Sequence, residues 1–152
     1  MPSLLSEQQI ATFRTDGVLC IRQAFDQNWL DLLAQGIDRN IREPGPVGRK
    51  YTPDGSPGGF FGDYCNWDRI GEYEQFMRHS PAPQLAAEAM TSPSARIFHE
   101  HVLVKEPGTR ERTPWHHDQP YYCVDGDQIC SIWLSLDHVP ASAGVEFAAG
   151  PH

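Results

Sequence analysis

The sequence is poor in the features that mark several classes of protein. It has four cysteines and no Cys-x-x-Cys pair, which excludes the usual zinc-finger spacing and a disulfide-rich framework. No apolar run approaches the ~20 residues of a membrane-spanning helix. The N-terminus also lacks the basic and long apolar regions of a signal peptide. We therefore expect reduced thiols, with a disulfide between Cys123 and Cys130 as the alternative. We also expect a cytoplasmic location and no membrane partner.

Positive charge is scarce as well. The chain has 12 Lys and Arg against 20 Asp and Glu, which gives a formal net charge of −8. Proteins that bind nucleic acid usually carry a basic patch or stripe, so we expect no nucleic-acid partner. A hydrophobic content of 39% and 152 residues suit one folded domain, so residues 1–152 are predicted to form a single domain.

The first part of the chain, residues 1–94, is predicted to be helical. Ser6 and Gln9 have the spacing of a capping box, which predicts a short helix after Ser6. A brief strand is expected at Val18–Ile21. Asp26 can cap a second helix, whose apolar side chains recur at helical spacing.

Two further short helices are expected at Ile70–Met77 and Pro81–Met90, with Ser80 as a cap for the second of them. Between the second and third helices, residues 44–69 are rich in Gly and Pro but also contain several aromatic side chains. This composition predicts a long ordered loop that covers a pocket.

The second part, residues 95–152, alternates in the manner of strands. Residues 96–105 are predicted to form a strand with His99 and His101 on one face, and residues 128–136 are predicted to form another. Helices followed by strands imply an α+β fold, or an all-β fold with added helices.

The most informative motif is His116-x-Asp118. Residues two apart on an extended chain point to the same face, so the imidazole and the carboxylate should project together. They would supply two of the three ligands of a 2-His-1-carboxylate facial triad, which holds non-heme Fe(II). Trp115 and Tyr121 flank the pair with bulky apolar surface that limits the access of water.

Several blocks follow one another in a distinctive order: Thr113-Pro114-Trp115-His116-His117-Asp118-Gln119-Pro120-Tyr121-Tyr122, Asp125-Gly126-Asp127, Ser131-Ile132-Trp133-Leu134, Gly144-Val145-Glu146-Phe147 and Gly150-Pro151-His152. In this order they resemble the phytanoyl-CoA dioxygenase family. The segment Lys105-Glu106-Pro107-Gly108-Thr109 is similar to that family too.

The resemblance implies a double-stranded β-helix, which is a cupin-like jelly roll, with N-terminal helices. It also implies Fe(II), 2-oxoglutarate as cosubstrate, and the hydroxylation of a small-molecule substrate by molecular oxygen. His116 and Asp118 are carried over as iron ligands. Trp133 and Val102 fall where the family lines the cosubstrate pocket, although Trp133 also fits an ordinary core aromatic.

The sequence departs from the family pattern at its end. In the family, a distal iron-binding His and an Arg that grips 2-oxoglutarate lie beyond the Gly-x-His turn, and this chain stops at that turn with His152. The resemblance therefore implies a jelly roll that is incomplete at the C-terminus, in the N-terminal portion of a larger enzyme or in a degenerate relative.

Two other functions stay open. One is a non-catalytic jelly-roll binding module or degenerate fragment that lacks the third iron ligand. The other is a hydrolase that uses zinc or another divalent metal, although His99-Glu100-His101 does not have the His-Glu-x-x-His spacing of such enzymes.

Overall fold

The computed structural model describes residues 2–150. The first two elements of the chain are helices with side-chain caps at their N-termini. In α1 (Glu7–Asp16), the Ser6 hydroxyl accepts from the Gln9 amide at 3.2 Å and the Gln9 side chain accepts from the Ser6 amide at 2.9 Å. The predicted capping box is therefore confirmed. The longer helix α2 (Gln27–Arg42) starts at Asp26, whose carboxylate accepts from the Trp29 amide at 3.2 Å.

Two short helices follow in the middle of the chain, close to their predicted positions. They are α3 (Gly71–His79) and α4 (Ala82–Ala89). The Ser80 hydroxyl accepts from the Ala82 amide at 3.2 Å, which is the contact expected of a cap before this helix. No helix within residues 2–150 has both the length and the apolar character needed to cross a bilayer.

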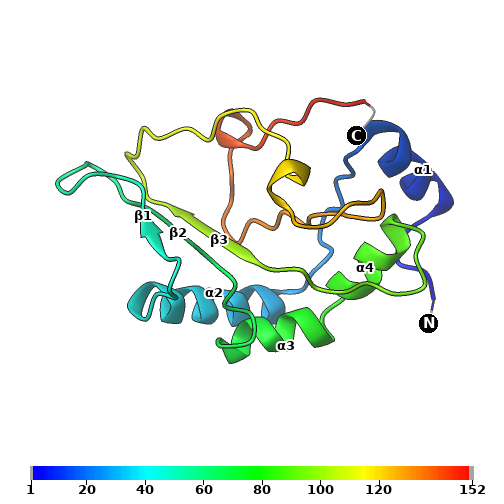
Figure 1. Ribbon diagram of the computed structural model, residues 1–152, viewed down its shortest axis with the longest axis horizontal. Helices are drawn as coiled ribbons and strands as arrows, with labels where there is room; N and C mark the ends of the chain where they lie inside the picture. Colours follow the sequence, from blue (N-terminus) through cyan, green and yellow to red (C-terminus); the bar gives the residue numbers. More distant parts are fainter. Residues whose placement is uncertain (1, 151–152) are drawn as a thin grey trace.

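The sheet has three antiparallel strands in the order β1-β2-β3. They are β1 (Arg49–Lys50), β2 (Phe60–Tyr64) and β3 (His101–Lys105), and β2 pairs along its whole length with β3. In Figure 1, α2 and α3 lie along one side of the sheet, and the chain after β3 runs along the other side. The helices and the small antiparallel sheet form the predicted α+β architecture, while the jelly roll stays a prediction.

Four of the predicted elements differ from the structure. Residues 44–69 are not one loop, because they contain β1 and β2. The strand expected at 96–105 is reduced to β3, since β2 ends at Tyr64 and the next residue, Cys65, turns away with a φ of 63°. Val18–Ile21 is irregular, and residues 128–136 form no backbone ladder with any other described segment, so neither is a strand.

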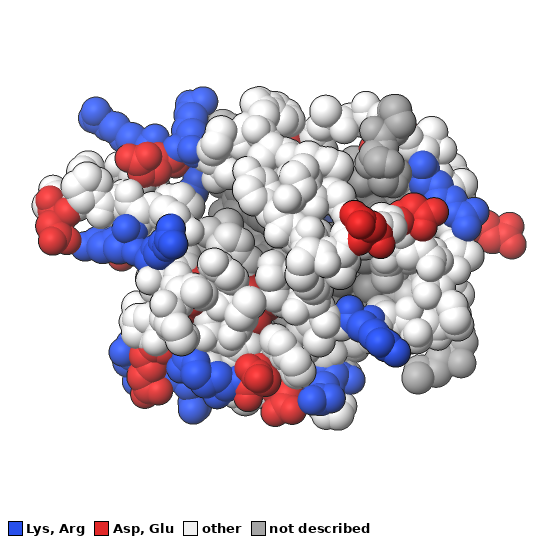
Figure 2. Space-filling model, in the orientation of Figure 1, with Lys and Arg blue, Asp and Glu red and all other residues white. Residues whose placement is uncertain are grey.

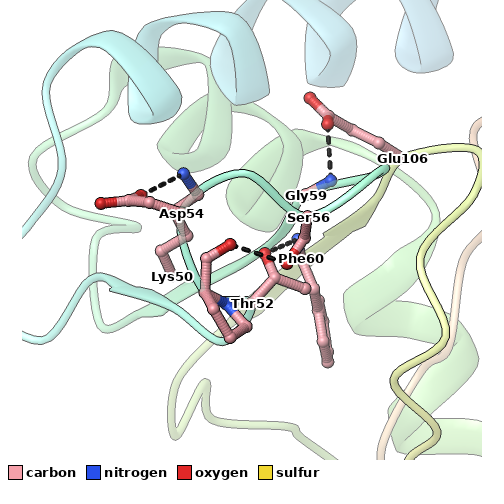
Figure 3. A network of polar contacts seen from close by, with 8 residues as sticks. Lys50, Thr52, Asp54, Ser56, Gly59, Phe60 and Glu106 are labelled. Carbon is pink, nitrogen blue, oxygen red and sulfur yellow. Dashed lines mark hydrogen bonds and ion pairs between the residues drawn. The ribbon is translucent and has the colours of Figure 1, made fainter.

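The turn between β1 and β2 is tied to the chain that leaves β3 (Figure 3). The Thr52 hydroxyl accepts from the Phe60 amide at 3.1 Å and closes the turn, while Lys50 and Asp54 form an ion pair at 3.0 Å. The Glu106 carboxylate accepts from the Gly59 amide at 2.7 Å. The start of the segment that leads to His116 is therefore fixed against the sheet.

The buried part of the molecule lies between the helices and the sheet. Its apolar members are Leu5, Phe60, Ile70, Tyr73, Phe76, Ala82 and Leu85. Polar side chains are buried beside them and are hydrogen-bonded, as burial requires. Glu100, for example, accepts from the amides of Asn66 and Trp67 at 2.7 and 2.9 Å. These two bonds fix the turn after β2, opposite the residues that precede β3.

Candidate metal site

His116 and Asp118 lie on the irregular segment after β3. The chain has no regular secondary structure at 109–117 and then enters a short 3₁₀ turn, η1 (Gln119–Tyr121), for which Asp118 is the first flanking residue. The Nε2 atom of His116 is 3.2 Å from the Oδ1 atom of Asp118. The structure therefore brings the two predicted ligand side chains together, with about half of each side chain still exposed to solvent.

The orientation of the His116 ring is set by its other nitrogen. Nδ1 lies 2.8 Å from the carbonyl oxygen of Pro114. Because a carbonyl only accepts hydrogen bonds, Nδ1 is the donor of this contact, and Nε2 is the nitrogen that faces Asp118. A backbone carbonyl on the far nitrogen is a common support for a metal-binding histidine.

The second oxygen of Asp118 has partners of its own. The Tyr122 hydroxyl lies 3.4 Å from Oδ2 and the Ser131 hydroxyl lies 3.3 Å from it. The two hydroxyl oxygens are 3.2 Å from each other. The two carboxylate oxygens of Asp118 therefore have different partners: Oδ1 faces His116, and Oδ2 faces the two hydroxyl groups.

Aromatic side chains connect this segment to the sheet. The ring centroid of Tyr122 is 5.2 Å from that of Phe98 and 5.7 Å from that of His99, in both cases near edge-to-face. Tyr64 of β2 in turn lies 5.5 Å from His101. These contacts place the residues that lead into β3 against the segment that carries the His116-Asp118 pair.

The charge of Asp118, one member of the pair, acts on the pKa of His101. Desolvation lowers the pKa of His101 below its usual value, the neighbouring His99 acts in the same direction, and the charge of Asp118 opposes both. The desolvation of the ring therefore disfavours the charged form of His101.

The geometry of the pair suits a metal ion. Two atoms that bind an octahedral ion at adjacent positions, each about 2.1 Å from it, lie about 3 Å apart. The separation of 3.2 Å between Nε2 and Oδ1 meets this requirement. Within residues 2–150, no three His, Cys, Asp or Glu side chains are grouped closely enough to hold a metal together, and His152 lies outside the described residues.

Comparison with protein families gives a match over most of the chain. Residues 13–152 match the family model described as phytanoyl-CoA dioxygenase. The chain belongs to the phytanoyl-CoA dioxygenase family. Members of this family are generally dioxygenases, so membership indicates an oxidoreductase. No curated protein and no solved structure matched the chain.

Two other residues were predicted from the same resemblance to line the cosubstrate pocket of this phytanoyl-CoA dioxygenase relative. Trp133 is 56% exposed, so it is not an ordinary core aromatic in the described structure. Val102 is half-buried on β3, where strand alternation puts it on the face opposite to His101. The roles of Trp133 and Val102 beside a cosubstrate stay predictions.

Sequence reasoning missed Tyr122 and Ser131 as partners of Asp118. Tyr122 follows Asp118 by four residues, a spacing that a single helical turn brings together, and η1 supplies such a turn. Ser131 is 13 residues away from Asp118, and no local spacing signals that contact. Only the path of the chain between them places the serine there.

The surface around these elements is mixed in charge. On the face shown in Figure 2, acidic and basic side chains are intermixed around the margin, and uncharged side chains cover most of the centre. No single sign of charge dominates the described residues that are visible on this face.

Proposed function

We propose that this protein is an Fe(II)- and 2-oxoglutarate-dependent dioxygenase that hydroxylates a small-molecule substrate. Family membership supports the oxygenase class. The His116-Asp118 pair supports the proposal at the level of residues, because Nε2 of His116 and Oδ1 of Asp118 face each other at 3.2 Å. Under this proposal the fold is a cupin-like jelly roll with N-terminal helices.

The donor atoms of the pair suit ferrous iron. An imidazole nitrogen and a carboxylate oxygen are two members of the facial set that non-heme Fe(II) oxygenases use. Bound there, the iron would supply the activation of dioxygen, with 2-oxoglutarate as the source of two of the electrons. The protein's own residues bind and orient the reactants and limit the access of water.

His116 and Asp118 have separate tasks in this proposal. The Pro114 carbonyl keeps the proton of His116 on Nδ1, so that Nε2 stays available as a ligand. Asp118 supplies a negative charge through Oδ1, which offsets part of the charge of the cation. We assign Trp133 to the wall of the cosubstrate pocket, where its apolar surface would exclude water. Val102, which lies on the face of β3 opposite to His101, is assigned to the same pocket from the family resemblance alone.

The test is to bind metal and cosubstrate without oxygen. Addition of Fe(II) and 2-oxoglutarate to the anaerobic protein should produce a weak charge-transfer band in the visible spectrum. His116→Ala should abolish the band because it removes one of the two ligands. His117→Ala is the matched control, since the neighbouring histidine has no part in the pair, and it should retain the band.

Turnover is measured separately, as oxygen consumption coupled to the release of succinate from 2-oxoglutarate. A band that persists in His116→Ala contradicts the ligand assignment. Metal and cosubstrate binding without oxygen consumption, in the presence of candidate substrates, would instead identify a non-catalytic binding module.

A further inference from the structure

We infer that Tyr122 and Ser131 form a hydroxyl clamp that holds Asp118 in the orientation needed to bind the metal. The clamp is defined as these two hydroxyl groups and their contacts to the Oδ2 atom of Asp118. This inference rests on the proposed function. It adds two positioning residues, which would act on the metal through Asp118 and not touch it.

The division of contacts between the two carboxylate oxygens is the first argument. Oδ1 faces Nε2 of His116 at 3.2 Å, and Oδ2 faces the hydroxyls of Tyr122 and Ser131 at 3.4 and 3.3 Å. A carboxylate that is free at one oxygen can rotate or bind a cation through both oxygens. With Oδ2 occupied by hydroxyl donors, Oδ1 is the oxygen left for the ion, which favours monodentate binding.

The second argument is that the Tyr122 ring is itself held in place. It packs on Phe98 and His99, at centroid distances of 5.2 and 5.7 Å, and both interplanar angles exceed 60°. Edge-to-face packing of this kind fixes a ring without blocking its hydroxyl. The residues before β3 therefore determine where the Tyr122 hydroxyl points, and through it the orientation of Asp118.

Either hydroxyl of the clamp can hold Asp118 without the other. Each hydroxyl has one proton, and the two oxygens lie 3.2 Å apart, so one hydroxyl can donate to the other while that one donates to Oδ2. When one hydroxyl is removed, the other can still donate directly to the carboxylate. Only the loss of both leaves Oδ2 without a donor from the clamp, so the two substitutions should act synergistically.

The experiment measures the affinity for Co²⁺, followed by the visible absorption of the bound ion. Tyr122→Phe and Ser131→Ala alone should each weaken binding by less than about threefold, because the second hydroxyl remains. The double variant should weaken binding by about 10- to 100-fold, the range found when supports of a metal ligand are removed. Its Co²⁺ absorption bands should also shift, since Asp118 is free to change its mode of binding.

The matched control is Tyr51→Phe with Ser142→Ala, which removes a tyrosine and a serine hydroxyl from exposed positions outside the clamp. This double variant should bind Co²⁺ as the wild type does. Ser131→Thr in the Tyr122→Phe background keeps one hydroxyl and should restore most of the affinity. Circular dichroism and thermal unfolding monitor the fold of each variant.

The outcomes separate the clamp from the proposed function. If the wild type binds Co²⁺ and the Tyr122/Ser131 double variant binds it equally well with the same spectrum, the clamp is wrong while the metal site stands. If the wild type binds no divalent ion, the proposed function and the clamp fail together.

Discussion

Asp63 is the most completely enclosed charged side chain in the described structure, with no exposed surface. Its Oδ2 atom accepts from the Asn40 side chain and from the Gly45 amide, both at 2.7 Å. Its Oδ1 atom accepts from the Tyr64 amide at 2.9 Å. One carboxylate on β2 thus fixes the end of α2 and the start of the chain that leads to β1.

Asp63→Asn should lower the free energy of unfolding by about 2–3 kcal/mol. An asparagine amide has one accepting oxygen, so its NH₂ group would have to face at least one of the N–H donors that now meet a carboxylate. Urea denaturation measures the loss. The control is Asp54→Asn on the exposed β1–β2 turn, which loses one surface ion pair and should change stability by less than about 0.5 kcal/mol. Equal effects at the two positions would contradict the assigned role of Asp63.

The contribution of Asp63 should depend on pH. Burial by itself would raise the pKa of Asp63, but the hydrogen bonds from Gly45, Asn40, Asn66 and Tyr64 outweigh it and hold the pKa below its usual value. A carboxyl with a lowered pKa in the folded state stabilises the fold above its unfolded pKa, and this stabilisation is lost as pH falls through the folded value. The difference in unfolding free energy between wild type and Asp63→Asn should therefore be constant above pH about 5 and shrink below pH about 4. A difference that grows on acidification would contradict the sign of the shift.

At the residue scale, the sequence predicted contacts that depend on local spacing and missed those that depend on the path of the chain. His116 and Asp118 are two residues apart, so a short stretch of chain is enough to bring their side chains together. The contacts of Asp63 with Asn40, 23 residues away, and of Ser131 with Asp118 depend on how separate elements meet. Periodicity and capping signals do not predict contacts between residues that are distant in the sequence.

At the scale of elements, α2 and α3 approach each other closely at a glycine. A Cβ atom at Gly36 would lie 2.6 Å from Cε1 of Tyr73 and 2.9 Å from its Cδ1. Tyr73 is 2% exposed, and its hydroxyl donates to the Asn40 side chain at 3.3 Å. The ring therefore has little freedom to move away, and the absence of a side chain at Gly36 sets the distance between the helices.

Gly36→Ala should destabilise the protein although alanine is the better helix former. The gain in helix propensity is about 1 kcal/mol, whereas overpacking against a fixed ring costs about 1–3 kcal/mol, so we expect a net loss of up to about 2 kcal/mol. The same substitution at Gly71 in the first turn of α3 meets no atom within 4 Å and should be neutral or slightly stabilising. The measurement is the thermal unfolding temperature of the two variants. A higher unfolding temperature for Gly36→Ala than for the wild type would contradict the prediction, because it would show that α2 and α3 can move apart without loss of stability.

The helices were predicted well and the strands were not, for a physical reason. A helix pairs its backbone within itself, so caps such as Ser6 and Asp26 and the apolar spacing are sufficient signals. A strand exists only if a partner lies beside it. Residues 128–136 alternate as a strand would, but no described segment forms a ladder with them. In contrast, β2 pairs with β3 although its composition looked like that of a loop.

At the scale of the whole molecule, burial is distributed unevenly along the chain. Every buried apolar side chain in the described structure lies between Leu5 and Leu85, and none of the side chains at positions 106–150 is buried. Large apolar side chains in this second region remain exposed, including Trp115 at 70% and Tyr121 at 78%. The candidate metal site thus lies on the part of the chain that contributes least to the core.

Amide hydrogen exchange should reveal this division. The amides paired between β2 and β3 and those of α2 and α3 exchange only when the core opens, whereas those at 110–140 have few backbone hydrogen bonds and little burial to protect them. We therefore expect metal-free protein, measured by mass spectrometry of peptic fragments, to exchange at 110–140 within the shortest labelling times and to retain protection in β2 and β3. Trypsin should agree, cutting first after Arg110 or Arg112 in this exposed region. Protection at 110–140 equal to that of the β2–β3 ladder would contradict the prediction, because it would require burial that the described contacts do not provide.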